Sequence, residues 1–235
     1  MLSNFMHLRI PSGKHSRSTP VFSNGSFGLH RERAAVLFVD FHGTLSNDIY
    51  WSTLQEPLRS KIQTLLFQEN TSMVKSWMRG QLSSEEICQF VSDKLVLAYE
   101  QIWNGLVDSC HRIKISNWAL RRIEQLRQDH VVCLITSNMD CFTRYVVPRK
   151  KLSNTFDFVF NSADFGLLKE DNRGELFRIV CKHLRVDIQE CTLVDDSDDL
   201  CRLFEELGGW SRFVQGRKLK PQHLFPLYQL RLPMM

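Results

Sequence analysis

The fold of this chain is decided by residues 34–45, which read Ala34-Ala35-Val36-Leu37-Phe38-Val39-Asp40-Phe41-His42-Gly43-Thr44-Leu45. The apolar run at its start, β-branched at Val36 and Val39, predicts a strand buried on both faces, as in a parallel sheet. The strand ends on a carboxylate, Asp40, and a polar turn containing Gly43 follows. Ligands bind at the carboxyl ends of strands in open α/β sheets, so Asp40 either caps a turn or belongs to a ligand site.

The bulk composition is that of an ordinary globular protein. The chain has 235 residues, 43% hydrophobic and 24% charged, which suits one domain or a core with an insertion. The formal net charge of +4 comes from basic residues concentrated in residues 1–33 and 216–235. Because the interior is nearly balanced, we expect no nucleic-acid partner. No apolar run approaches the roughly 18 residues of a bilayer span, so we expect no membrane partner either. The sequence carries no signal for an oligomeric state.

The cysteines and the N-terminal segment bear on the cellular compartment. The seven cysteines are scattered without a Cys-x-x-Cys pair, which favours buried thiols in a reducing compartment. Residues 1–32 are rich in Ser, Arg and His and are interrupted by Pro and Gly, which predicts a flexible basic leader. We therefore expect a cytoplasmic protein, or a mitochondrial or plastid one if the leader is a transit peptide.

The order of apolar segments predicts an α/β fold with an insertion. Further strands are expected at residues 131–135, 156–160, 191–194 and 210–214, and they alternate with helical patterns, which indicates a doubly wound parallel sheet. Residues 46–114 show helical periodicity for about four helices and no strand, with Ser83 and Glu86 spaced as a capping box. We expect a core of residues 33–45 and 115–215, a helical cap of residues 46–114, and a tail of residues 216–235 to which we assign no role.

Polar side chains follow the predicted strands at the same edge of the sheet. They are Asp40 after the first strand, Ser137 and Asn138 after the second, Lys169 at the start of the helix after the third, and Asp195 and Asp196 after the fourth. Each has a structural alternative: turn residues for 137–138, a surface lysine for Lys169, and an acidic helix start for residues 195–199. Their common position favours one converging site.

The chemistry of these residues is complementary. The carboxylates of Asp40, Asp195 and Asp196 would bind a hard divalent cation, and Mg²⁺ prefers such oxygen ligands while leaving positions for a phosphate. Lys169 would keep Asp40 ionised and bind a phosphoryl oxygen. An Asp that attacks phosphorus forms an aspartyl-phosphate, which divides hydrolysis into two easier steps.

These residues, in this order, resemble the four motifs of the haloacid dehalogenase-like (HAD) hydrolase superfamily over about residues 34–215. The string Asp-Phe-His-Gly-Thr-Leu is similar to the first motif of that family, Asp-x-Asp-Gly-Thr-Leu/Val, whereas Lys169-Glu170 departs from its common Lys-Pro. The resemblance implies a Rossmann-like core whose cap is inserted between the first two motifs. It also implies the site roles: Asp40 and Lys169 catalytic, Thr44, Ser137, Asn138 and Lys169 phosphate-binding, and Asp40, His42, Asp195 and Asp196 metal-binding.

His42 stands where family phosphatases carry a second Asp that acts as general acid/base. The backbone carbonyl that binds magnesium is retained, and an imidazole with an ordinary pKa near 6.5 can still carry a proton. We therefore predict a magnesium-dependent phosphatase of a small phosphorylated metabolite, with His42 catalytic and cap side chains such as Trp77, Arg79 or Trp103 setting specificity. The alternatives are a dehalogenase- or phosphonatase-like hydrolase, or an impaired relative that works as a binding protein.

Overall fold

A parallel sheet of five strands, in the order β3-β2-β1-β4-β5, forms the centre of the computed structural model, which describes residues 35–224. The strands are β1 (Val36–Val39), β2 (Val131–Thr136), β3 (Phe158–Asn161), β4 (Cys191–Asp195) and β5 (Trp210–Phe213). The chain starts in the middle of the sheet and adds strands first on one side and then on the other, which confirms the doubly wound arrangement. The predicted leader, residues 1–32, and residues 225–235 of the tail lie outside the described residues.

The first strand is buried because it is paired on both sides and covered on both faces. Val36 pairs with Val131 of β2 and with Cys191 of β4, and all four residues of β1 are fully buried. Side chains alternate along the strand, so Val36 and Phe38 face one core cluster and Leu37 and Val39 face the other. This accounts for the continuous apolar run in the sequence.

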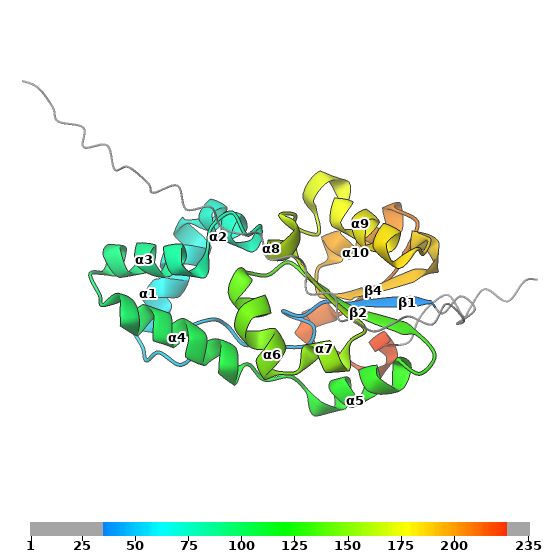
Figure 1. Cartoon of the computed structure of the whole chain (residues 1–235), viewed down its shortest axis with the longest axis horizontal. Helices are drawn as coiled ribbons and strands as arrows, with labels where there is room; N and C mark the ends of the chain where they lie inside the picture. The colour runs from blue at the N-terminus through cyan, green and yellow to red at the C-terminus, as the bar shows by residue number, and fades with distance from the viewer. Residues whose placement is uncertain (1–34, 225–235) are drawn as a thin grey trace, which may run out of the picture.

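Helices cover the two faces of the sheet (Figure 1). One face is covered by α9 (Glu175–Leu184) and α10 (Asp198–Glu206), and the other by α5 (Asn117–Leu126) and α7 (Leu152–Thr155). The shorter elements of this part are the π-helical η2 (Phe142–Val146), α6 (Val147–Arg149), α8 (Ser162–Phe165), and the 3-10 helices η3 (Asp171–Arg173), η4 (Ile188–Glu190), η5 (Gln215–Arg217) and η6 (Pro221–Leu224).

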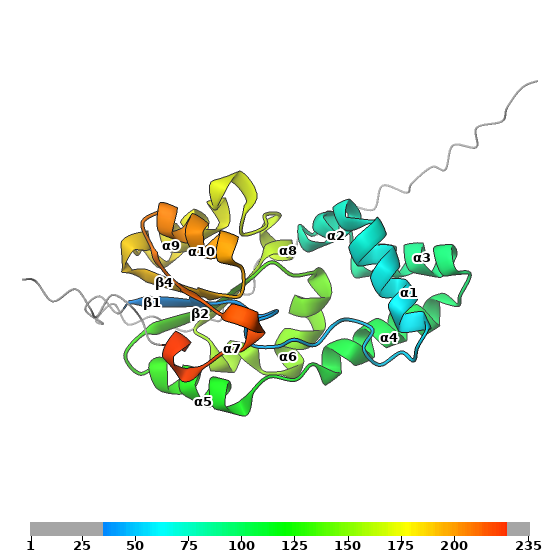
Figure 2. The same ribbon diagram turned by 180° about the vertical axis from the view of Figure 1, so that it is seen from behind.

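The insertion between β1 and α5 is helical and lies together at one end of the molecule (Figures 1 and 2). It contains α1 (Leu58–Thr64), the π-helical η1 (Leu65–Glu69), α2 (Thr71–Met78), α3 (Ser84–Leu95) and α4 (Tyr99–Arg112). The capping box of Ser83 and Glu86 begins α3 as expected. The core cluster that contains Leu37 and Val39 also contains Trp51 and Trp77, so one apolar core extends from the sheet into the insertion. Residues 46–114 remain our proposal for the extent of the cap.

Three details differ from the sequence expectation or bear on it. The third strand begins at Phe158 rather than residue 156, because Phe156 ends α7 as its C-cap and is fully buried there. All seven cysteines lie in the described range and are buried free thiols. Within residues 35–224, none of the helices is long and apolar enough to cross a bilayer.

Candidate functional site

Asp40 is the first residue after β1 and is held in place by its backbone. Its amide donates to Val194 O at 2.9 Å, which continues the pairing with β4 by one residue. The chain then turns sharply, with Leu45 N donating to Phe41 O at 2.8 Å. The Asp40 side chain is only 6% exposed, so a buried strand delivers this carboxylate to a fixed position under the surface.

Gly43 is required in this turn because the carboxylate of Asp196 lies against its backbone. Its φ of +85° favours glycine, and a Cβ built there would lie 2.0 Å from Asp196 Oδ2. The turn after β1 and the turn after β4 therefore approach each other closely enough to bring Asp40 and Asp196 into one site.

Lys169 joins the ends of β1 and β4. Its ammonium donates to Asp40 Oδ1 and to Asp195 Oδ2, each at 2.6 Å, and the lysine is 3% exposed. The prediction that Lys169 begins a helix is wrong. It lies in a turn between α8 and α9, because Gly166 ends α8 in the left-handed region and the chain then crosses the sheet edge before Glu175. A surface lysine is excluded by its burial.

The charges at this site are strongly coupled. Burial raises the pKa of Asp40 to about 7, although the charge and hydrogen bond of Lys169 act in the opposite direction. Burial alone would lower the pKa of Lys169, but the charges of Asp195 and Asp40 outweigh it and raise the pKa. The lysine therefore stays protonated, and the carboxyl group of Asp40 is kept from full ionisation at neutral pH.

The carboxylates of Asp40, Asp195 and Asp196 form a group that could hold a metal ion. One oxygen from each lies within 4.8 Å of the other two. Oxygen ligands of this charge match a hard cation such as Mg²⁺ and do not match zinc or copper, which favour nitrogen and sulfur. A cation there would also offset the cost of burying the negative charge of Asp40. The donor set therefore fits magnesium.

The acidic run that begins with the last residue of β4 has two parts, which Ser197 separates. Ser197 is the N-cap of α10 and accepts a hydrogen bond from Leu200 N, and Asp198 and Asp199 lie in the first turn of the helix. Asp195, by contrast, is the last residue of β4 and is 1% exposed. The acidic helix start proposed for the whole run is therefore right only for its second half.

The three other proposed phosphate-binding side chains differ in their hydrogen-bond partners. Ser137 and Asn138 follow β2, and Thr44 lies in the turn after β1. Ser137 Oγ accepts a hydrogen bond from Lys169 N at 3.0 Å, which places it beside the lysine loop. Asn138 is buried, and its Oδ1 accepts from Tyr50 Oη at 2.5 Å. Thr44 is 5% exposed, and its Oγ1 has no hydrogen-bond partner among residues 35–224.

The His42 side chain is half-buried and is not a member of the three-carboxylate group. Burial and then the positive charge of Arg217 lower its pKa, while Asp196 and Asp48 act in the opposite direction. The imidazole is therefore neutral at neutral pH, and its surroundings are Asp196, Arg217 and Asp48.

The sequence analysis did not identify Arg217 as a site residue. It lies in the C-terminal tail, where no motif or periodic pattern indicates a contact with the site. Its Nε donates to Asp196 Oδ2 at 3.1 Å, and its carbonyl accepts from Asn47 Nδ2. The three cap side chains named as candidates for specificity make contacts within the protein. Trp77 is fully buried and donates to Asp140, Arg79 is paired with Asp171, and the Trp103 ring packs against Tyr99 and Tyr145.

Comparisons with solved structures find the same fold. A HAD family enzyme from Bacteroides thetaiotaomicron, in complex with magnesium and inorganic phosphate, matches 85% of this chain and 100% of its own at 17% identity, with a TM-score of 0.60. A predicted HAD-like family hydrolase from Porphyromonas gingivalis matches 77% and 91% at 18% identity, TM-score 0.57. An L-2-haloacid dehalogenase from Xanthobacter autotrophicus with covalently bound chloropropionic acid matches 77% of both chains at 14% identity, TM-score 0.56. No protein-family model and no curated protein matches the sequence.

Proposed function

We propose, on the premise that this chain has the fold of the HAD-like hydrolases, that it is a magnesium-dependent phosphatase of a small phosphorylated metabolite. The observation that carries the proposal is the buried Lys169 between Asp40 and Asp195, with Asp196 completing a group of three carboxylates. A magnesium ion held there by Asp40, Asp195, Asp196 and the carbonyl of His42 would neutralise charge on the phosphoryl group. The enzyme from Bacteroides thetaiotaomicron binds magnesium and phosphate within the same fold, which supports this ligand chemistry.

The chain's own residues account for the chemical steps. An oxygen of Asp40 attacks phosphorus, and the bond from phosphorus to the ester oxygen breaks. The leaving oxygen takes a proton from the protonated form of His42, which the lowered pKa of this imidazole confines to the acidic part of the pH range. Water then attacks phosphorus while neutral His42 takes a proton from the water. The bond between phosphorus and the Asp40 oxygen breaks, which releases phosphate and restores the carboxylate of Asp40 and the protonated His42. Lys169 and the hydroxyl of Ser137 hold phosphoryl oxygens, and the unpartnered hydroxyl of Thr44 lies in the same turn as the nucleophile.

The proposal is tested by hydrolysis of p-nitrophenyl phosphate between pH 5 and 8, with magnesium or with a chelator. We expect turnover that requires magnesium and that Asp40→Asn abolishes. Asp198→Asn is the matched control, because Asp198 lies on the same acidic run but pairs with Arg202 at the surface. Absence of turnover of any phosphate ester in this pH range would refute the proposal, and magnesium binding without turnover would then indicate a binding protein.

The histidine in place of the second Asp favours a second candidate, a dehalogenase-like hydrolase. The L-2-haloacid dehalogenase from Xanthobacter autotrophicus, which holds chloropropionic acid covalently, has a similar fold. Chloride release from 2-chloropropionate in the presence of a chelator would favour this reading. His42→Asp separates the two phosphatase cases: a lower rate means that His42 is an adapted acid/base, and a higher rate means that the natural imidazole is the weaker group.

A further inference from the structure

Two loops carry the proposed phosphate-binding side chains, and each is followed by a helical turn that begins with an acidic residue bound by the cap. Asp140 lies three residues after Ser137, and Asp171 lies two residues after Lys169. The loops also touch each other, since Lys169 N donates to Ser137 Oγ at 3.0 Å. Both acidic residues contact one short part of the cap, residues 77–84, which joins the end of α2 to the start of α3.

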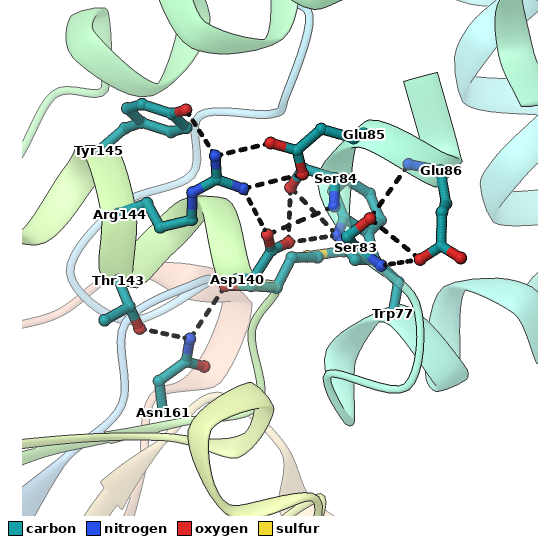
Figure 3. A network of polar contacts seen from close by, with 11 residues as sticks. Trp77, Ser83, Ser84, Glu85, Glu86, Asp140, Thr143, Arg144, Tyr145 and Asn161 are labelled. Carbon is teal, nitrogen blue, oxygen red and sulfur yellow. Dashed lines mark hydrogen bonds and ion pairs between the residues drawn. The ribbon is translucent and has the colours of Figure 1, made fainter. Parts of the chain in front are cut away.

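Asp140 is bound by donors from two helices of the cap, α2 and α3 (Figure 3). Its Oδ1 accepts from Trp77 Nε1 at 2.7 Å and from Ser84 Oγ at 2.5 Å, and its Oδ2 accepts from Arg144 Nη1 at 3.0 Å. The amide of Ser84 also points at Oδ2, at 3.3 Å, so the carboxylate sits at the N-terminus of α3, where the helix dipole favours an anion. Arg144 continues the network by donating to both oxygens of Glu85.

Asp171 is bound by Arg79 through two parallel hydrogen bonds. Arg79 Nε and Nη2 donate to its two carboxylate oxygens at 2.6 Å each, a geometry that gives the strongest arginine–carboxylate pairs. Asp171 Oδ2 also accepts from Leu168 N at 2.9 Å, so the pair fixes the backbone next to Lys169. The adjoining end of α2 lies directly on α8, because a Cβ at Gly80 would come within 2.3 Å of Ala163 O.

We propose that Trp77, Arg79 and Ser84 form a clasp that positions the loops of Ser137 and Lys169 through Asp140 and Asp171. Docking of the cap and binding of phosphate then favour each other, because releasing the cap frees both loops at once. Asp140 and Asp171 are positioning residues, since their oxygens are occupied by cap and loop donors. This inference rests on the proposed function for its substrate, but its structural part is tested independently below.

The kinetic test compares Arg79→Gln with Arg127→Gln. Arg127 pairs with Asp157 at a similar exposure, 29% and 18% against 25% and 18% for Arg79 and Asp171, and Asp157 accepts from Val132 N as Asp171 accepts from Leu168 N. Unlike Arg79, Arg127 contacts one oxygen of its partner and also donates to the carbonyl of Asn154. That pair lies at the start of β2, away from the candidate site. We expect similar losses of thermal stability, but only Arg79→Gln should raise KM for p-nitrophenyl phosphate and weaken binding of inorganic phosphate, by roughly fivefold or more. The kcat should change much less. Arg79→Lys should recover part of the lost phosphate affinity because it keeps the positive charge, and the recovery should be incomplete because lysine cannot form the two parallel hydrogen bonds.

The structural test uses amide hydrogen exchange and does not depend on catalysis. Arg79→Gln should increase exchange in residues 166–171, and Trp77→Phe, which removes one donor but keeps a ring, should increase it in residues 137–144. Equal effects of Arg79→Gln and Arg127→Gln on phosphate affinity, or uniform exchange across the molecule, would overturn the clasp. If the wild-type protein neither hydrolyses esters nor binds phosphate, the proposed function fails, and localised exchange then still supports the clasp while uniform exchange overturns it.

Discussion

Replacing the proposed nucleophile should destroy activity and stabilise the metal-free protein. Burial raises the pKa of Asp40 from 3.8 to about 7, so the folded state holds a proton that the unfolded chain releases near pH 4. Stability is therefore greatest below the unfolded pKa and falls as pH rises through the folded one. Asn in place of Asp40 resembles the protonated carboxyl group and should not carry this penalty.

The size of the effect follows from the two pKa values. With about 1.4 kcal/mol for each pKa unit, Asp40→Asn should stabilise metal-free protein by about 2 kcal/mol at pH 5 and about 4 kcal/mol at pH 7. For a protein of this size, the larger value corresponds to a rise in Tm of roughly 10 °C. Saturating magnesium should remove or reverse the difference, because a cation bound by ionised Asp40 stabilises only the folded wild type.

The assay is thermal and urea unfolding of wild type, Asp40→Asn and the control Asp198→Asn in a chelator at pH 5, 6 and 7. The control should stay within about 0.5 kcal/mol of wild type, since Asp198 is a surface residue. A destabilised Asp40→Asn protein, or a gain that does not grow with pH, would refute the electrostatic reasoning. The same variant should lose hydrolysis by a factor of about 10⁴ or more if Asp40 is the nucleophile.

Three further predictions concern the turn, the imidazole and the core. Gly43→Ala should unfold more easily and bind magnesium more weakly in calorimetry, because the added Cβ meets Asp196 Oδ2 and φ is positive; unchanged magnesium affinity would contradict this contact. Arg217→Gln should raise the pKa of His42 in NMR titration, since a nearby positive charge is removed; a fall would mean that Arg217 is not its neighbour. Phe38→Ala should cost about 3–5 kcal/mol in urea unfolding, because the ring packs edge-on against Phe204; a cost below 1 kcal/mol would mean that the core refills the space.

The positions of the central strands β1, β2 and β4 are predictable because burial on both faces leaves continuous apolar runs, whereas the edge strands β3 and β5 are only partly buried. The alternation of strands with helices predicts a doubly wound parallel sheet, but it does not give the order β3-β2-β1-β4-β5, which the structure shows. The start of the third strand did not follow, since an apolar residue such as Phe156 can be buried equally well at a helix end. The turn at Lys169 was mistaken for a helix start because Gly166 and the charged residues after Lys169 suit either reading.

The site residues at strand ends can be predicted from the sequence. Contacts between segments that are far apart in the sequence cannot. Asp40 and Asp195 come together because parallel strands end at one edge, and the turn after α8 places Lys169 between them. Arg217 reaches Asp196 from a segment with no periodic pattern, and Arg79 pairs with Asp171 across more than ninety residues of chain. Neither contact leaves a local trace in the sequence.

The acidic residues of this region differ in how completely their negative charge is neutralised by neighbouring protein groups. Asp171 has its own arginine and a backbone donor, and Asp140 has Arg144 and a helix terminus, so neither carboxylate has charge left for a ligand. The three carboxylates at the sheet edge face one buried lysine and one exposed arginine, which leaves an excess of negative charge in a buried position. A second buried cation would remove that cost, and the chain does not provide one among its described residues. The excess negative charge costs stability in the metal-free protein but binds a cation in the functional one. For this reason Asp40→Asn should stabilise the protein only when magnesium is absent.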